Sequence, residues 1–142
     1  MRQGWTPHWL CSARVAEKQS AESVEIGSGL RVAHGPRGRG VFATRRFAKG
    51  EVIETCPTVE VADADVTGHL NDYVFTSVRD SDVLLVLGYG MLYNHSPNPN
   101  VEYEQDEPST ITFRALRKVR SGDELTIDYG EEWWATRGLE PN

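Results

Sequence analysis

The feature that most constrains the fold is a short apolar run, residues 83–87, which ends at a glycine and leads into a polar cluster. Five apolar residues bounded by glycine are typical of a buried strand, because a buried helix needs a longer run. The cluster, residues 88–100, holds three Asn, one His, two Tyr and two Gly among thirteen residues. Since it follows a buried strand, we expect its side chains to be held rigidly where the chain leaves the core.

Runs that alternate apolar and polar residues predict further short strands. The clearest are residues 110–119 and residues 124–129, where Leu125, Ile127 and Tyr129 share one face. Shorter strands are expected at residues 30–33, 52–54, 59–61 and 100–104.

A single helix is expected among these strands. Leu70, Tyr73 and Val74 follow the i, i+3, i+4 spacing of a helix face, and the acidic residues at 63 and 65 can cap its start. We predict about ten helical residues that end near Ser77. Many short strands with little helix indicate a mostly β domain built of small sheets.

Length, charge and cysteine content limit the classes of function. The chain has 142 residues and a net charge of -6, which predicts one domain and disfavours direct nucleic-acid binding, because phosphate recognition uses clustered Lys and Arg. A basic, lysine-containing protein partner suits this negative net charge, although an acidic surplus also serves plain solubility.

Cys11 and Cys56 lack metal-site spacing, so we expect a reduced, cytoplasmic protein without zinc. No run has the length of a membrane span, so no membrane partner is expected.

The chain divides into three predicted parts. Residues 1–23 mix Trp, Ser, Glu and Lys without a period, and we expect a mobile N-terminal extension. Residues 24–134 form the domain, and residues 135–142 are a C-terminal tail.

Three segments resemble the signature of the SET-domain protein lysine methyltransferases. Asn94-His95-Ser96 with Pro99-Asn100 resembles the family's Asn-His-Ser-Cys-x-Pro-Asn segment, residues 124–129 resemble its Glu-Leu-Thr-x-x-Tyr segment, and residues 38–40 match its Gly-x-Gly. Three elements in this order, about fifty and then thirty residues apart, make a specific signal. The chain is similar to the short, single-domain members of large DNA viruses and bacteria, which lack the zinc cluster that follows the domain elsewhere.

The resemblance implies a fold and an activity. The SET fold is mostly β, with small β-clip-like sheets, one short helix and a C-terminal pseudoknot that brings Asn94 and Tyr129 together. The implied activity is methylation of protein lysines with S-adenosyl-L-methionine as cofactor. A histone or another basic protein is the implied substrate class, and a histone substrate would place the protein in the nucleus or on chromatin. A homodimer is compatible with the family.

The resemblance also assigns roles to individual residues. Tyr129 is the catalytic candidate. The implied cofactor contacts are the glycine loop, the motif pair and a stacking indole: Arg37, Gly38, Arg39, Gly40, Asn94, His95 and Trp134. The implied walls of the lysine channel are Tyr73, Tyr93 and Trp133. For these aromatic residues a plain core role is the competing interpretation.

The chemistry of methyl transfer explains the residue types. Displacement at a sulfonium by an amine requires alignment, exclusion of water and a neutral amine, whereas a strong base is not required. Desolvation and the nearby sulfonium charge lower the lysine pKa from about 10.4. A tyrosine supplies both an aromatic wall and an orienting oxygen.

Two departures from the family pattern leave an alternative open. Pro97 stands where many members have Cys, and the zinc cluster is absent. In this alternative, the chain is a catalytically weak SET-fold module that binds cofactor or a basic peptide without turnover.

A hydrolase built on Ser96, His95 and Asp128 is disfavoured, because adjacent Ser and His point apart and no nucleophile elbow precedes them. Acidic residues, Glu131, Glu132, Asp128 and the run 102–107, suit the steering of a basic peptide.

Overall fold

The structure is a computed structural model that describes residues 24–25, 29–77, 82–107 and 109–141. Its strands are β1 (Val24–Glu25), β2 (Leu30–Gly35), β3 (Gly38–Ala43), β4 (Val52–Ala62), β5 (Phe75–Thr76), β6 (Asp82–Val86), β7 (Asn94–His95), β8 (Val101–Glu107), β9 (Thr110–Ala115) and β10 (Glu124–Ile127). Three 3₁₀ turns and one α-helix complete these regions: η2 (Asp63–Asp65), η3 (Gly68–Asp72), η4 (Gly90–Leu92) and α2 (Glu131–Ala135). The predicted extension, residues 1–23 with Cys11, lies outside the described residues.

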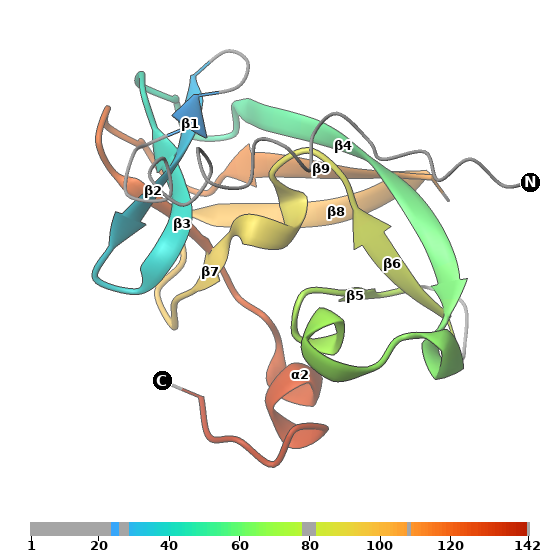
Figure 1. Cartoon of the computed structure of the whole chain (residues 1–142). Helices are drawn as coiled ribbons and strands as arrows, with labels where there is room; N and C mark the ends of the chain where they lie inside the picture. Colours follow the sequence, from blue (N-terminus) through green and yellow to red (C-terminus); the bar gives the residue numbers. More distant parts are fainter. Residues whose placement is uncertain (1–23, 26–28, 78–81, 108, 142) are drawn as a thin grey trace, which may run out of the picture.

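The strands form two five-stranded sheets (Figure 1). One has the order β1-β2-β3-β10-β7 and the other has the order β5-β6-β4-β9-β8. The second sheet is antiparallel throughout. The small, curled sheets and their scarce helix confirm the predicted mostly β fold.

The C-terminal strand lies between two much earlier segments of the chain. β10 pairs antiparallel with β3 on one side and parallel with β7 on the other. The parallel register sets Thr126 beside Asn94 and Ile127 beside His95. This insertion is the arrangement expected of the C-terminal pseudoknot, and it brings the two signature segments side by side.

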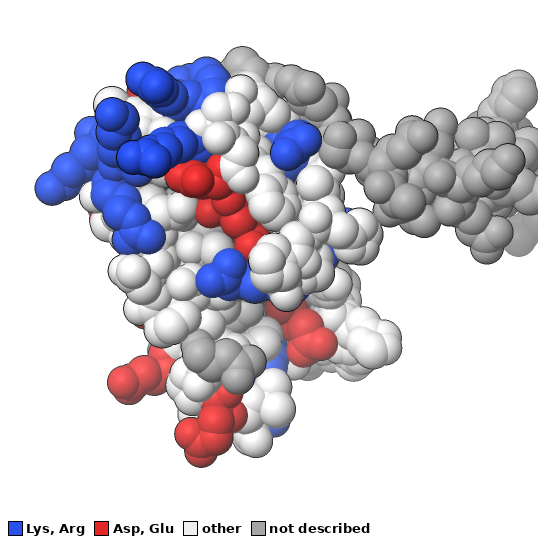
Figure 2. Space-filling view, turned by 90° about the vertical axis from the view of Figure 1, so that its left-hand side faces the viewer, with Lys and Arg blue, Asp and Glu red and all other residues white. Residues whose placement is uncertain are grey.

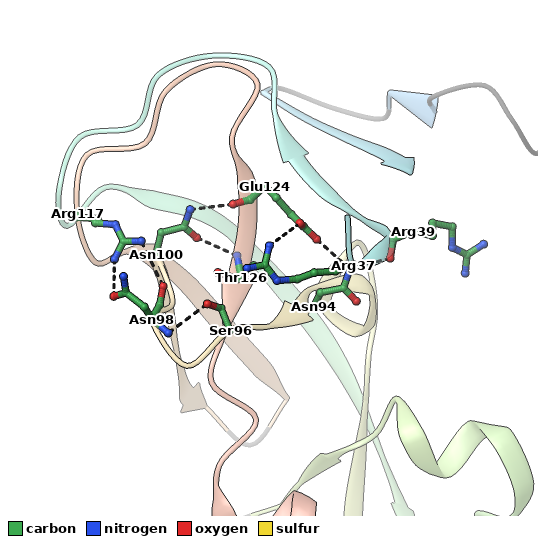
Figure 3. A network of polar contacts seen from close by, with 9 residues as sticks. All are labelled: Arg37, Arg39, Asn94, Ser96, Asn98, Asn100, Arg117, Glu124 and Thr126. Atoms are coloured by element: carbon green, nitrogen blue, oxygen red, sulfur yellow. Dashed lines mark hydrogen bonds and ion pairs between the residues drawn. The ribbon is translucent and has the colours of Figure 1, made fainter. Parts of the chain in front are cut away.

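Asn100 fastens β10 in this position. Its Nδ2 donates to the backbone carbonyl of Glu124 at 2.8 Å, and its Oδ1 accepts from the backbone N–H of Thr126 at 2.9 Å (Figure 3). Both side-chain atoms therefore bond the strand as a neighbouring backbone would. Asn100 is buried, so water does not compete for these bonds.

The core confirms the buried strand predicted from residues 83–87. In β6, Val83, Leu84 and Val86 are buried, whereas Leu87 lies beyond the strand and is 44% exposed. The short strands predicted at 52–54 and 59–61 are parts of one long strand, β4, with a register shift near its start.

The predicted helix near residues 63–77 is wrong. The segment forms two short 3₁₀ turns, η2 and η3, and then enters β5. Gly68 has φ +65°, and the preceding Thr67 is extended, so helical dihedrals are interrupted in the middle. Leu70 and Tyr73 are 42% and 44% exposed. The apolar spacing therefore does not mark a buried helix face.

Candidate active site

The segment that leads into the site depends on a close backbone approach at Gly90. A Cβ on Gly90 would lie 2.2 Å from Cγ1 of Val86, a distance that no real contact reaches. Glycine therefore allows η4 to pack directly against β6 and to deliver Tyr93, Asn94 and His95 at the edge of β10.

Asn94 lies in a polar network that joins the glycine loop to β10 (Figure 3). Its Nδ2 donates to the carbonyl of Arg39 at 3.0 Å and to Oε1 of Glu124 at 2.9 Å. The other oxygen of Glu124 accepts from Arg37 at 3.1 Å. A Cβ on Gly40 would lie 2.6 Å from Glu124 and 2.7 Å from Asn94, so only glycine fits beside this pair.

His95 and Tyr129 are joined by a hydrogen bond. The backbone N–H of Tyr129 donates to Nδ1 of His95 at 3.1 Å, which leaves the ring proton on Nε2. That Nε2 is buried and has no hydrogen-bond partner among the described residues. The ring of Trp134 meets the imidazole edge-on, with centroids 4.9 Å apart.

A cavity of about 480 Å³ opens at this point. We name it the histidine cavity. It is lined by Arg37, Asn94, His95, Pro97, Tyr129 and Trp134. Four of the seven predicted cofactor residues, Arg37, Asn94, His95 and Trp134, therefore surround one hollow, whereas Gly38, Arg39 and Gly40 do not line it. The unusual Pro97 is part of its wall.

A second cavity, of about 450 Å³, also has Tyr129 in its wall. We name it the tyrosine cavity, because its walls include the four rings of Tyr73, Tyr93, Tyr103 and Tyr129 together with Trp133. The structure thus brings together all three residues predicted for the lysine channel. A hollow of about 390 Å³ is lined by Asn94 as well as Tyr73 and Trp133 and so connects the two regions.

Tyr129 is shared by both cavities and by the hollow that connects them. Its hydroxyl donates to the carbonyl of Tyr93 at 2.9 Å. Burial raises the pKa of Tyr129 to about 12, with smaller contributions from Tyr73 and Glu124. The phenol therefore keeps its proton at neutral pH, and its oxygen lone pairs remain able to accept a hydrogen bond.

Tyr93 has both roles that the sequence left open, a wall of the lysine channel and a core residue. Its side chain is only 2% exposed, stacks on Phe113 with centroids 4.6 Å apart, and donates its hydroxyl to Glu54 at 2.8 Å. Burial is the main cause that raises the pKa of Glu54, and burial beside Glu54 raises that of Tyr93. Tyr93 is thus a core residue that also contributes to the wall of the tyrosine cavity.

Arg137 holds the helix α2 against η3. Its guanidinium lies 4.1 Å from the ring centroid of Trp133, forms an ion pair with Asp72 at 3.3 Å, and donates to the carbonyl of Asn71. Trp133 in turn lies 4.7 Å from the ring of Tyr129. These contacts fix Trp133 at the wall of the tyrosine cavity.

Sequence reasoning missed three residues of this site. Tyr103 lines the tyrosine cavity, Glu124 joins Asn94 to Arg37, and Arg137 positions Trp133. Tyr103 shares a face with Val101 in the predicted strand 100–104, so alternation contained a usable signal. Arg137 lies in the predicted tail, where no pattern distinguishes it.

Two kinds of feature are absent from the described part of the chain. No helix there is long and apolar enough to cross a membrane. No group of three or more His, Cys, Asp or Glu there could hold a metal ion.

Comparisons with known proteins agree with this geometry. A family model, the SET domain, matches residues 38–130. The histone-lysine N-methyltransferase, H3 lysine-37 specific, of Schizosaccharomyces pombe is 31% identical over 104 residues, which cover 69% of this chain and 70% of that protein. The histone-lysine N-methyltransferase Suv4-20 of Caenorhabditis briggsae is 29% identical over 113 residues, 75% of this chain but only 34% of that protein.

Solved structures show the same relationship. A candidate histone methyltransferase of Plasmodium falciparum superimposes with a TM-score of 0.65 at 34% identity, covering 77% of this chain and 99% of that one. The structure of ctPRC2 in complex with H3K27me3 and H3K27M contains a chain that superimposes with a TM-score of 0.61 at 17% identity, covering 75% of this chain and 15% of that one, a likeness of fold alone. The chain therefore belongs to the SET-domain family of protein-lysine methyltransferases.

Proposed function

We propose that this chain transfers a methyl group from S-adenosyl-L-methionine to lysine side chains of a basic protein, with a histone as the candidate substrate. One observation carries the proposal: Tyr129 lines both the histidine cavity and the tyrosine cavity. A residue that lines both cavities can contact two reactants, one in each cavity.

The histidine cavity fits the cofactor. The buried Nε2 of His95 is a donor without an acceptor among the described residues, and an adenine nitrogen can supply that acceptor. Trp134 provides a face for stacking, and Arg37 of the glycine loop lies in the wall of the same cavity. When bound, S-adenosyl-L-methionine supplies a sulfonium whose methyl group is electrophilic.

The tyrosine cavity suits a lysine side chain. Its aromatic walls accommodate the aliphatic stem, and loss of water around the amine lowers the amine pKa. The Tyr129 hydroxyl donates its hydrogen bond to the carbonyl of Tyr93, so its oxygen can accept an N–H of the amine and orient the nitrogen lone pair. Because its pKa is about 12, Tyr129 orients the amine and does not act as a phenolate base.

Charge at the mouth of this cavity favours a basic peptide. Asp72, Glu131 and Glu132 all line the tyrosine cavity, and all three are exposed. Carboxylates in this place attract a lysine-rich segment and increase the rate at which it associates with the channel. The names of the relatives, which include an enzyme specific for H3 lysine-37, support a histone substrate and with it a location in the nucleus.

A labelled-cofactor assay tests the proposal. The full chain is incubated with methyl-labelled S-adenosyl-L-methionine and purified histones, and mass spectrometry locates the added methyl groups. We expect label on lysine, with the variant Tyr129→Phe strongly impaired while calorimetry shows that it still binds the cofactor. Cofactor binding by the wild type without transfer to any basic protein would contradict the proposal and favour a module that does not turn over.

A further inference from the structure

On one face of the described chain, positive charge gathers at one end of the molecule (Figure 2). Figure 2 shows Lys and Arg side chains gathered at the upper end of one face, whereas Asp and Glu lie at its centre and lower end. The net charge of -6, which predicts no nucleic-acid binding, sums over all faces and conceals this separation. Local potential at a surface depends on the charges near it and not on the total.

Two turns that pack against each other carry exposed cations. Phe47 and Val119 form an antiparallel bridge, with both backbone N–H groups donating across it at 3.1 and 2.9 Å, and both side chains are fully buried. We define the basic surface as the exposed cations on these two turns other than Arg45, which pairs with Glu51: Arg46, Lys49, Arg117, Lys118 and Arg120.

These cations are not neutralised by neighbouring carboxylates. Of the two acidic residues on the turns, Glu51 pairs with Arg45 at 2.7 Å, and Asp123 accepts the backbone N–H of Arg120. Within the described part of the chain, no ion pair reaches the five side chains of the basic surface. The bridge also sets Arg46 beside Arg120, and like charges placed opposite each other cost stability unless an anion separates them.

Arg117 is held in place by neutral acceptors. Its guanidinium donates to Oδ1 of Asn98 at 3.2 Å, to the carbonyl of Pro99 at 3.0 Å and to that of Asn98 at 3.3 Å (Figure 3). The full positive charge is therefore retained while the side chain is already ordered. Asn98 and Pro99 belong to the segment that carries His95, so the basic surface is joined rigidly to the site.

The chemistry of this surface fits the phosphate backbone of a nucleic-acid duplex. Single-stranded nucleic acid is bound by stacking its bases on exposed aromatic rings. Among the described residues, Tyr73 and Tyr103 are the exposed aromatic rings, and both line the tyrosine cavity instead. Protein interfaces are anchored by well-packed aromatic residues and arginines, and beside the five cations these turns offer Leu116 as the exposed large apolar side chain. Phosphate binding needs only the cations themselves.

We propose that the basic surface, formed by Arg46, Lys49, Arg117, Lys118 and Arg120, binds the phosphate backbone of double-stranded DNA. A basic tail associated with DNA then meets carboxylates at the tyrosine cavity while the duplex occupies the opposite end of the molecule. This second step rests on the proposed function. Duplex binding itself does not rest on the proposed function, because it can be measured without any transfer of methyl groups.

The test is fluorescence anisotropy of the full chain with a labelled DNA duplex of about 20 base pairs at several salt concentrations. Each phosphate neutralised contributes about -0.9 to the slope of log K against log salt, so four contacts predict a slope of about -3.6. Affinity should then fall about a hundredfold between about 50 and about 200 mM salt.

Three double variants separate the surface from net charge. Arg46→Gln with Lys49→Gln, and Lys118→Gln with Arg120→Gln, each remove two cations from the surface. Ala64→Glu with Thr67→Glu lowers the net charge by the same amount, at exposed positions on and beside η2, far from the surface (Figure 1). Circular dichroism and thermal melting are used to check that all three are folded.

The expected result is that each Gln pair weakens duplex binding at least tenfold and reduces the salt slope by about 2, whereas the Glu pair binds within about threefold of wild type. Equal losses in all three variants would show that only net charge matters. Absence of binding at low salt would overturn the proposal, as would displacement of the duplex by polyglutamate at lower charge concentration than by unlabelled DNA. Methyl transfer to a free histone peptide by the Gln variants is a separate readout, so failure of either proposal is recognised independently.

Discussion

Replacement of Asn100 by Ala tests how the C-terminal strand is held in the site. The substitution removes the partners of two backbone groups, the carbonyl of Glu124 and the N–H of Thr126. An unpaired backbone group in a buried position costs about 1–3 kcal/mol, so two cost about 2–6 kcal/mol. Because a domain is stable by only about 5–15 kcal/mol, this loss is a large fraction of its stability.

Urea denaturation followed by circular dichroism measures this loss as a lower midpoint with an unchanged slope. The matched control is Asn98→Ala, which removes one acceptor of the exposed Arg117 and should cost at most about 1 kcal/mol. If Asn100→Ala were as stable as the control, β10 would be held by its strand pairing alone, and the inferred role of the side-chain clamp would be refuted.

Three further predictions concern the site. Tyr129→Phe should lower kcat at least about 100-fold with little change in cofactor Kd, because the ring remains but the amine loses its orienting oxygen. Burial raises the folded-state pKa of Glu54 above its ordinary value of 4.5, so its contribution to stability is full below that value and is lost as pH rises through the folded pKa. Urea midpoints from acid to neutral pH should therefore fall less in Glu54→Gln than in wild type. Arg137→Gln should raise the peptide KM by about 2- to 30-fold, because it releases Trp133, while Arg137→Lys restores part of the effect.

Each of these predictions has a contrary result. A Tyr129→Phe enzyme with wild-type kcat would remove the hydroxyl from the mechanism. Equal pH dependence in wild type and Glu54→Gln would show that this carboxyl does not titrate differently in the folded state. A loss of cofactor affinity in Arg137→Gln, with an unchanged peptide KM, would place Arg137 on the other side of the site.

Local pattern was informative wherever burial dominates. The apolar run 83–87 is a buried strand, and alternation found the strands that contain Ile111 and Leu125. It placed strand ends less well, since β9 stops at Ala115 and β10 at Ile127. The signature residues lie together because β10 pairs with β7, a long-range contact that no local pattern encodes.

The remaining features could not be predicted from the sequence for physical reasons. The helical spacing of Leu70 and Tyr73 was misleading because Gly68 interrupts the helix, Leu70 is exposed, and Tyr73 lines a cavity instead of packing in the core. The sequence did not predict the basic surface for a different reason. Its cations come from turns about seventy residues apart, which the bridge between Phe47 and Val119 joins.

The central claim is that two cavities with different occupants meet at Tyr129, and the adjacent residues Trp133 and Trp134 test it most directly. The measurement compares Trp133→Ala with Trp134→Ala by calorimetry with S-adenosylhomocysteine and by steady-state kinetics with a lysine peptide. Loss of a stacking ring is worth about 1–3 kcal/mol, or about 5- to 150-fold. The account predicts that Trp134→Ala weakens cofactor binding by this factor and Trp133→Ala raises the peptide KM, with each variant changing the other quantity less than about threefold. If both variants impaired the same step, or the two effects were exchanged, the assignment of the cavities would be contradicted.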